Sequence, residues 1–252
     1  MNPLNRRELL TQGAAGVGAT MLVSTIATRV AAATASPQLK LNKGDTILFQ
    51  GDSITDCHRQ KKRKTANDAQ AMGLGYPLQI GSNLLMNNPS LNLKIFNRGI
   101  SGNRVPSLQQ RWDKDCIALK PNVLSILVGV NDIWHKLNGK YKGTTESYRV
   151  EFTELLTETK RQLPETTIVI CEPFALKVGA VTNKWFPEFD DRRQVAREVC
   201  DAAGATWVPF QSMFDQAIEA GPPAKYWAAD GVHPSMAGHA LMAATWQKVV
   251  LG

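Results

Sequence analysis

The alternation of short apolar runs with longer amphipathic stretches most constrains how this chain can fold. We predict strands on the apolar runs, at 46–50, 93–97, 123–128, 167–171 and 206–208. Stretches with helical periodicity separate them, and we predict helices at 76–86, 106–116, 148–162, 189–203 and 235–250. Continuous apolar strands that alternate with helices are typical of a parallel sheet covered on both faces. The sequence therefore predicts an α/β protein, a three-layer α/β/α sandwich with a five-stranded parallel sheet.

The length and composition are consistent with one domain. The chain has 252 residues, of which 43% are hydrophobic, enough for one large core. We find no internal repeat and no low-complexity linker, so we predict that residues 36–252 form a single domain. The sequence leaves the oligomeric state open.

The first 35 residues are typical of an export signal rather than of a folded segment. The hexapeptide 5–10, Asn-Arg-Arg-Glu-Leu-Leu, resembles a twin-arginine motif, and small residues near Ala33 and Ala35 fit a cleavage site. Gly and Thr interrupt the apolar stretch between them, which therefore falls short of the about 20 strongly apolar residues of a membrane span. We expect residues 1–35 to direct export to the periplasm or the cell exterior and then to be removed, leaving no membrane span.

Positive charge is present but is not arranged as in a nucleic-acid binder. The formal net charge is +7, and its densest part is the run 59–64, Arg-Gln-Lys-Lys-Arg-Lys. No aromatic residues interleave with this run, so we predict no nucleic-acid partner. We expect a solvated loop there, which can steer anionic substrates such as pectic sugars or phospholipid headgroups.

Four polar, glycine-bearing turns fall where a parallel sheet places its ligand site, beyond the carboxyl ends of the strands. The first is Gly51-Asp52-Ser53, directly after the first predicted strand. The others are 97–103, 129–132 and 230–233. Four such turns at one sheet edge are hard to explain by packing alone.

Three of these residues fit nucleophilic catalysis. Ser53 stands at a strand end, where its hydroxyl can attack a substrate once a base removes the proton. His233 is the candidate base, and Asp230, three residues earlier, can orient the imidazole and stabilise its charged form. The backbone N–H groups of Ser53 and Gly102 and the side-chain amide of Asn131 are candidate oxyanion donors.

Each residue also has an ordinary structural interpretation. Ser53 can be a helix N-cap, Asp230 a turn residue and His233 a solvated loop residue. Asn131 and Gly102 can serve only their own turns. Their joint occurrence, in order along one sheet edge, favours the hydrolase interpretation.

The same residues resemble the four blocks of the GDSL, or SGNH-type, hydrolases. These blocks are 51–54 (Gly-Asp-Ser-Ile), Gly102, 129–132 (Gly-Val-Asn-Asp) and 230–233 (Asp-Gly-Val-His). The resemblance implies a flavodoxin-like sandwich, Ser53 as nucleophile with Asp230 and His233 as triad partners, and Gly102 and Asn131 as oxyanion donors. It also implies cleavage of acyl esters and thioesters without a cofactor.

Other candidate residues surround this set. We predict substrate contacts at Asp52, Trp134, Tyr226 and Trp227. Ser101 sits in a sequence close to a nucleophile elbow, but Asn103 replaces the last glycine of that motif. The spacing of the four cysteines matches no zinc pattern, and neither the aspartates nor the histidines have ligand spacing, so we predict no metal.

The sequence thus predicts an exported serine esterase that hydrolyses short acyl esters, by preference O-acetyl groups on carbohydrate, through an acyl-serine intermediate. Two alternatives remain open. One is a lipase, lysophospholipase or thioesterase on the same fold, which a long apolar groove would favour. The other is a non-catalytic carbohydrate- or surface-binding protein.

Overall fold

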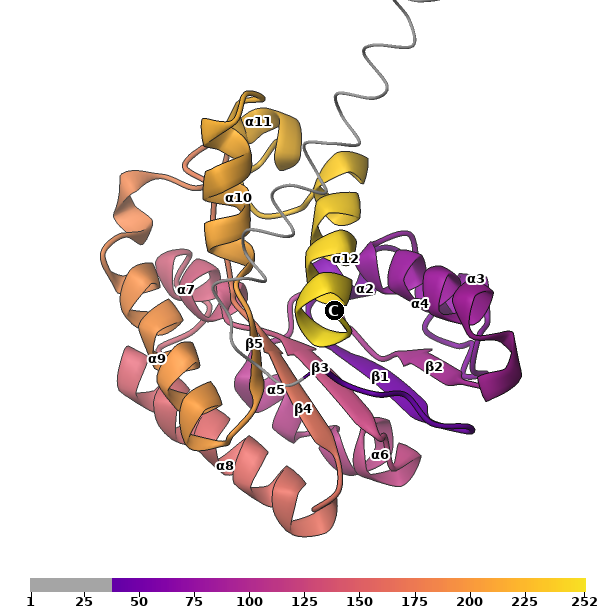
Figure 1. Ribbon diagram of the computed structural model, residues 1–252. Helices are drawn as coiled ribbons and strands as arrows, with labels where there is room; N and C mark the ends of the chain where they lie inside the picture. Colours follow the sequence, from indigo (N-terminus) through magenta and orange to yellow (C-terminus); the bar gives the residue numbers. More distant parts are fainter. Residues whose placement is uncertain (1–37) are drawn as a thin grey trace, which may run out of the picture.

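The computed structural model describes residues 38–252. The predicted export signal, 1–35, lies outside the described residues. The strands are β1 (Thr46–Gly51), β2 (Lys94–Asn97), β3 (Val123–Leu127), β4 (Thr167–Cys171) and β5 (Thr206–Val208). All neighbouring pairs are parallel, in the order β2-β1-β3-β4-β5, which confirms the predicted five-stranded parallel sheet (Figure 1).

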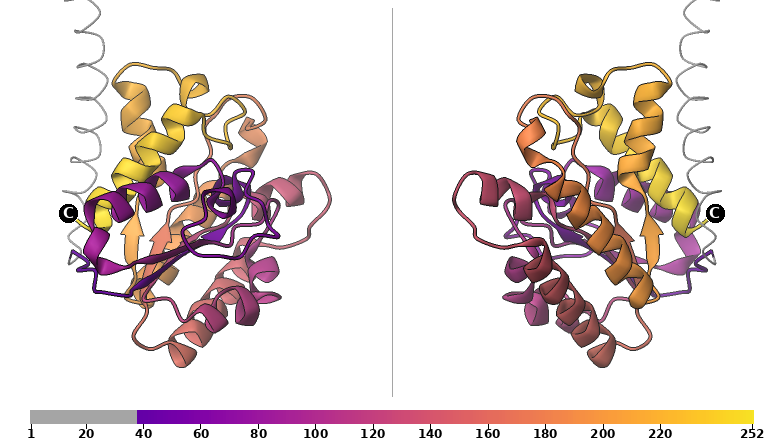
Figure 2. Two further views of the ribbon diagram at one scale, coloured as in Figure 1. Left: turned by 90° about the vertical axis from the view of Figure 1, so that its right-hand side faces the viewer. Right: turned by 90° about the vertical axis from the view of Figure 1, so that its left-hand side faces the viewer.

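Helices cover both faces of the sheet (Figures 1 and 2). One face carries α4 (Tyr76–Asn87), α10 (Phe210–Glu219) and α12 (Met236–Val250), and the other carries α5 (Val105–Gln109), α6 (Trp112–Asp115), α8 (Thr145–Gln162) and α9 (Glu188–Ala202). Side chains alternate between the two cores, so Ile47 and Phe49 point to the first face and Leu48 to the second. The shorter helices lie in the connections: α2 (Ser53–Asp56), α3 (Ala69–Met72), α7 (Val130–Leu137), α11 (Ala224–Trp227), and the 3₁₀ turns η1 (Pro89–Leu91), η2 (Ile117–Leu119) and η3 (Asn183–Trp185).

One predicted helix is wrong in its continuity. The stretch 106–116 folds as two short helices, α5 and α6, with Arg111 between them in a non-helical backbone conformation. The guanidinium of Arg111 donates to Asn103 Oδ1 at 2.8 Å and to Gln50 Oε1 at 2.9 Å, contacts that lie back toward the sheet. The helical pattern therefore breaks at the residue whose guanidinium makes these two contacts.

The strand order sets the place of the site. Beginning from β1, the chain adds β2 on one side and then returns to add β3 on the other, so the connections after β1 and β3 diverge. Such a switch point leaves a crevice at the carboxyl ends of the two strands. Ser53 follows β1 and Asn131 follows β3, so both lie at this crevice.

Candidate active site

The nucleophile turn is built by a glycine and a capping aspartate. Gly51 ends β1 with φ +155°, and a Cβ there would come within 2.4 Å of Leu127 O on β3 and of Thr55 Oγ1. Asp52 then accepts a hydrogen bond from the backbone N–H of Ile54 at 3.0 Å, which caps the short helix α2. Ser53 is the first residue of that helix and is half-buried at the crevice.

Ser53, His233 and Asp230 form one chain of hydrogen bonds. Ser53 Oγ lies 2.8 Å from His233 Nε2, and His233 Nδ1 lies 2.6 Å from Asp230 Oδ2. Since a carboxylate only accepts, the proton of a neutral imidazole belongs on Nδ1. Nε2 is then free to accept the Ser53 proton, as a general base must.

Asp230 is held as a carboxylate. Its other oxygen accepts the backbone N–H groups of Val232 at 2.9 Å and of His233 at 2.7 Å. Burial raises the pKa of Asp230, but the hydrogen bonds from the His233 side chain and from these two backbone groups outweigh it and lower the pKa. The carboxylate therefore stays charged opposite the imidazole.

A glycine and a helix cap fix the loop that carries these two residues. Gly231 has φ +86°, and a Cβ there would meet Leu176 O at 2.3 Å. Its carbonyl accepts the N–H of Leu176 at 2.8 Å, which joins the loop to the segment after β4. Ser235 then caps α12 by accepting the N–H of Gly238.

The predicted oxyanion donors lie on two adjoining segments. Asn131 is in the first turn of α7, and its Nδ2 donates to Asn103 O at 3.1 Å, one residue beyond Gly102. An amide nitrogen carries two protons, so one remains after this bond. The hydrogen bond ties α7 to the loop of Gly102, and the role of Ser53, Gly102 and Asn131 as oxyanion donors stays a prediction.

A buried polar network that the sequence did not predict lies beneath the nucleophile. Asn97 Nδ2 donates to Thr55 O at 2.6 Å and to Met72 O at 2.8 Å, while its Oδ1 accepts the N–H of Gly99. The only available signal was an asparagine at the end of an apolar strand.

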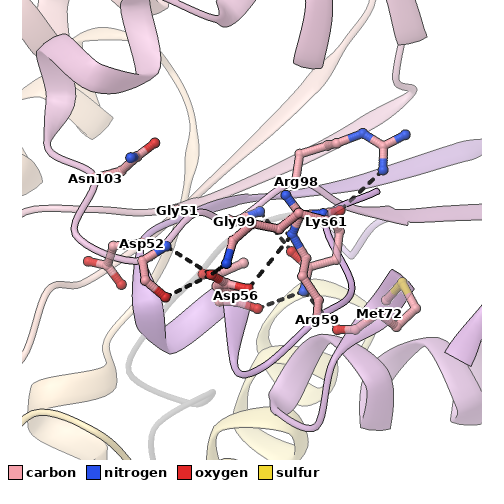
Figure 3. Close-up of polar contacts among 12 residues, drawn as sticks. Gly51, Asp52, Asp56, Arg59, Lys61, Met72, Arg98, Gly99 and Asn103 are labelled. Carbon is pink, nitrogen blue, oxygen red and sulfur yellow. Dashed lines mark hydrogen bonds and ion pairs between the residues drawn. The ribbon is translucent and has the colours of Figure 1, made fainter. Parts of the chain in front are cut away.

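Asp56 is the second centre of this network. Its Oδ2 accepts the backbone N–H of Ser101 at 2.9 Å and the Ser101 hydroxyl at 2.7 Å. Figure 3 shows Asp56 with Arg59 and Lys61 beside it. The segment around Ser101 is thereby fastened to the helix of the nucleophile, and the Ser101 hydroxyl is occupied as a donor.

The four predicted substrate contacts fall into two groups. The ring of Trp134 is half-buried and lies 5.9 Å from that of His233, and Tyr226 is exposed on α11. Asp52 and Trp227 are buried, so the structure does not expose either side chain to the pocket, and direct substrate contact by them stays a prediction. The side chain of Asp52 caps helix α2, and burial raises its pKa to about 7. Trp227 packs in the core, where its indole N–H donates to Pro222 O.

Two further titratable groups near the site, His239 and Cys57, contact each other. His239 Nδ1 accepts the N–H of Tyr76 at 3.2 Å, its Nε2 lies 3.4 Å from Cys57 Sγ, and burial lowers the pKa of its ring to about 4. All four cysteines lie within the described residues as free thiols. Over residues 38–252, no group of three or more His, Cys, Asp and Glu side chains is arranged to hold a metal ion, and no helix there is long and apolar enough to cross a membrane.

A pocket of about 480 Å³ opens beside Ser53 and His233. Ten residues line it, of which seven are polar or charged: Ser53, Asp56, His58, Lys61, Ser101, His233 and His239, with Ile54, Cys57 and Pro234. Fold, hydrogen-bond chain and pocket together have the form of a hydrolase site.

Comparisons with known proteins agree with that form. The model of the GDSL-like lipase/acylhydrolase family matches residues 49–241. An acetylxylan esterase from Geobacillus stearothermophilus is 32% identical over 209 residues, which are 81% of this chain and 93% of that protein.

Solved structures show the same likeness. A protein from Parabacteroides merdae described as a GDSL-like lipase has a TM-score of 0.82 and 47% identity, over 84% of this chain and 98% of its own. Axe2, an acetylxylan esterase from Geobacillus stearothermophilus, has a TM-score of 0.74 and 30% identity, over 84% of this chain and 96% of its own. Catalytic mutants of Axe2 in which a serine, an aspartate or a histidine is replaced by alanine have also been solved.

The protein is therefore a carboxylic ester hydrolase with an α/β/α fold. Within that class, the chain belongs to the GDSL-like lipase/acylhydrolase family. The family resemblance seen in the sequence is confirmed, and the alternative of a non-catalytic binding protein is set aside.

Proposed function

We propose that the protein removes O-acetyl groups from carbohydrate through an acetyl-Ser53 intermediate. The hydrogen-bond chain Ser53–His233–Asp230 at the mouth of the pocket carries this proposal. The similarity to acetylxylan esterases supports the carbohydrate substrate.

The chemistry follows from the geometry. His233 Nε2 takes the Ser53 proton while Oγ attacks the ester carbonyl carbon, and the new oxyanion is stabilised by the N–H groups of Ser53 and Gly102 and the amide of Asn131. Collapse of this intermediate breaks the bond to the sugar oxygen, which takes the proton from His233. Water, activated by the same imidazole, then releases acetate from Ser53.

The lining of the pocket supports a short acyl group. Seven of the ten residues that line the pocket are polar or charged, so its apolar surface is interrupted, whereas a long acyl chain needs an extended apolar wall. This observation favours the acetylesterase over the lipase, lysophospholipase or thioesterase alternative.

Two measurements test the proposal. Acetate release from acetylated xylooligosaccharides should be readily detectable for the wild type and lost in Ser53→Ala, with the circular dichroism spectrum unchanged. Along a p-nitrophenyl series from acetate to decanoate, kcat/KM should fall as the chain lengthens. A rise toward decanoate would overturn the short-acyl assignment and support the lipase alternative.

We also propose that the enzyme acts outside the cytoplasm, on the basis of the twin-arginine-like segment and of its polysaccharide substrate class. Replacement of Arg6 and Arg7 by lysine should retain the full-length chain inside the cell. Export that is unaffected by this change would contradict the proposal.

A further inference from the structure

The pocket beside Ser53 contains a lysine that the proposed hydrolysis does not use. Lys61 lines the same cavity as Ser53 and His233. Its side chain is 49% exposed, so its ammonium group is open to solvent and to a bound ligand. A cation that lines this pocket is available to an anionic group of a ligand bound there.

The buried carboxylate of Asp56 fixes the position of the Lys61 ammonium group. The ammonium lies 2.8 Å from Asp56 Oδ2, the oxygen that Ser101 also binds through its N–H and its hydroxyl. The Asp56 side chain is only 1% exposed. The negative partner is therefore buried beneath the ammonium, which has two further N–H donors for other acceptors.

Asp56 does not neutralise the positive charge of this region. Its carboxylate also lies 4.0 Å from Arg59 Nε, so one negative charge faces two cations (Figure 3). Across residues 56–68, five Lys and Arg side chains stand against two carboxylates, a net charge of +3. The second carboxylate, Asp68, is paired with Arg63. The rim next to the nucleophile is therefore electropositive.

We propose that Lys61 forms a subsite for a carboxylate carried by the sugar chain, so that the enzyme prefers acetylated carbohydrates containing acidic sugars. The inference rests on the proposed carbohydrate esterase function and adds a substrate class to it. Because Ser53 and Lys61 line the same pocket, an acetylated sugar with its ester at Ser53 can bring a neighbouring uronic acid to the ammonium. The surplus charge of the 59–64 run adds long-range attraction for such a chain.

The expected preference is modest and depends on salt. An exposed ion pair contributes at most about 1 kcal/mol, which corresponds to about a fivefold change in kcat/KM. Screening shortens the range of such an interaction to about 10 Å at 0.1 M salt and to about 3 Å at 1 M. A carboxylate subsite at Lys61 must therefore weaken as salt is added.

The experiment compares two forms of one substrate. Acetylated xylooligosaccharides that carry uronic acid groups are assayed beside the same material with its carboxylates capped as amides. The readout is the ratio of kcat/KM for the acidic form to that for the capped form. A loss of general activity lowers both values and leaves this ratio unchanged.

In the wild type, we expect a ratio above one that falls toward one as salt is raised. Lys61→Gln should lower the ratio about three- to fivefold at low salt and reduce its salt dependence, and Lys61→Arg should keep most of the preference. Lys62→Gln is the matched control, because it removes the same charge from the next residue, which does not line the pocket; its ratio should stay near that of the wild type.

Three results would overturn the inference: a wild-type ratio of one at low salt, an unchanged ratio in Lys61→Gln, or equal losses in Lys61→Gln and Lys62→Gln. The last would assign the effect to net charge alone. A larger loss by Lys61→Gln on an acetylated anionic lipid than on the acidic sugar would also overturn it. Each of these outcomes differs from failure of the proposed function, in which the wild type releases no acetate from either form.

Discussion

The two halves of the candidate active site are anchored in different ways. On the nucleophile half, Ser53 stands on a buried network in which Asn97 and Asp56 bind the backbone of the neighbouring segments. On the acid–base half, the side chains of His233 and Asp230 are 45% and 41% exposed. The difference shows what each half requires. An oxyanion site needs several main-chain segments in fixed relation, whereas the imidazole needs only one carboxylate, which its own loop supplies.

The largest effect should come from breaking the acid–base half without deforming it. Asp230→Asn keeps an oxygen for the backbone N–H groups of Val232 and His233, but its amide can favour the wrong tautomer of the imidazole. We expect kcat to fall by about 10⁴-fold with little change in the free energy of unfolding. Steady-state kinetics on p-nitrophenyl acetate and urea unfolding measure the two quantities. A kcat within tenfold of the wild type would show that Asp230 does not orient His233.

A smaller loss is expected on the nucleophile half from Asn131→Ala. Removing one oxyanion donor typically lowers kcat by about 10²–10³-fold, because it removes transition-state stabilisation and leaves substrate binding in place. Asn138→Ala, at the C-cap of the same helix, is the control and should keep wild-type kcat. If Asn131→Ala instead changes KM alone, the side chain contacts substrate and is not an oxyanion donor.

The network below the nucleophile should be needed for stability. Asn97 is completely buried and makes three hydrogen bonds to backbone groups, so Asn97→Ala leaves buried partners unsatisfied. We expect a loss of about 3 kcal/mol in the free energy of unfolding, measured by urea denaturation. Asn88→Ala removes a single side-chain bond at a half-buried helix end and should lose less than about 1 kcal/mol. Equal losses in the two variants would contradict a special role for the network.

The nucleophile half should also be sensitive to acid through His239. Burial, followed by the charge of His233, lowers the pKa of His239 from 6.5 to about 4, so the unfolded chain binds the proton more tightly than the folded one. The stabilisation from a neutral His239 is complete above pH 6.5 and is lost as pH falls toward 4, by about 3 kcal/mol in all. Asp52 has the opposite slope, because burial raises its pKa from 3.8 to about 7 and stability falls as pH rises through that range.

The difference between the wild type and His239→Gln isolates the first contribution, because both proteins keep Asp52. In unfolding titrations between pH 4 and 7, the variant should lose less stability than the wild type on acidification. Parallel curves for the two proteins would show that His239 does not carry the acid sensitivity.

Most of the fold could be predicted from the sequence, because buried parallel strands are continuous apolar runs. The predictions 167–171 and 206–208 agree with β4 and β5 at both ends. The break at Arg111 could not be predicted, since it accompanies a contact with Gln50, 61 residues earlier, and one with Asn103, which lies outside the predicted helix. Local periodicity does not report such contacts.

The candidate site could likewise be predicted only in part. The turn of Ser53 and the loop of His233 were recognisable because glycine, aspartate and histidine stand at short, fixed spacings. The functions of Asp56 and Asn97 depend on partners 25 to 45 residues away, which a sequence pattern does not reveal. The sequence also does not distinguish Trp134, which is half-buried, from Trp227, which is buried, because both are tryptophans close to site motifs.

We propose that the two halves act as one catalytic unit through the 2.8 Å contact between Ser53 Oγ and His233 Nε2. The most direct test is a double-mutant cycle of Ser53→Ala and His233→Ala, with kcat/KM measured for acetate release. We expect each single variant to lose at least about 10⁴-fold and the double variant to lose no more than the worse of the two, because residues that act as a unit are not additive. Losses that multiply in the double variant would show that the two residues act independently and would contradict the account.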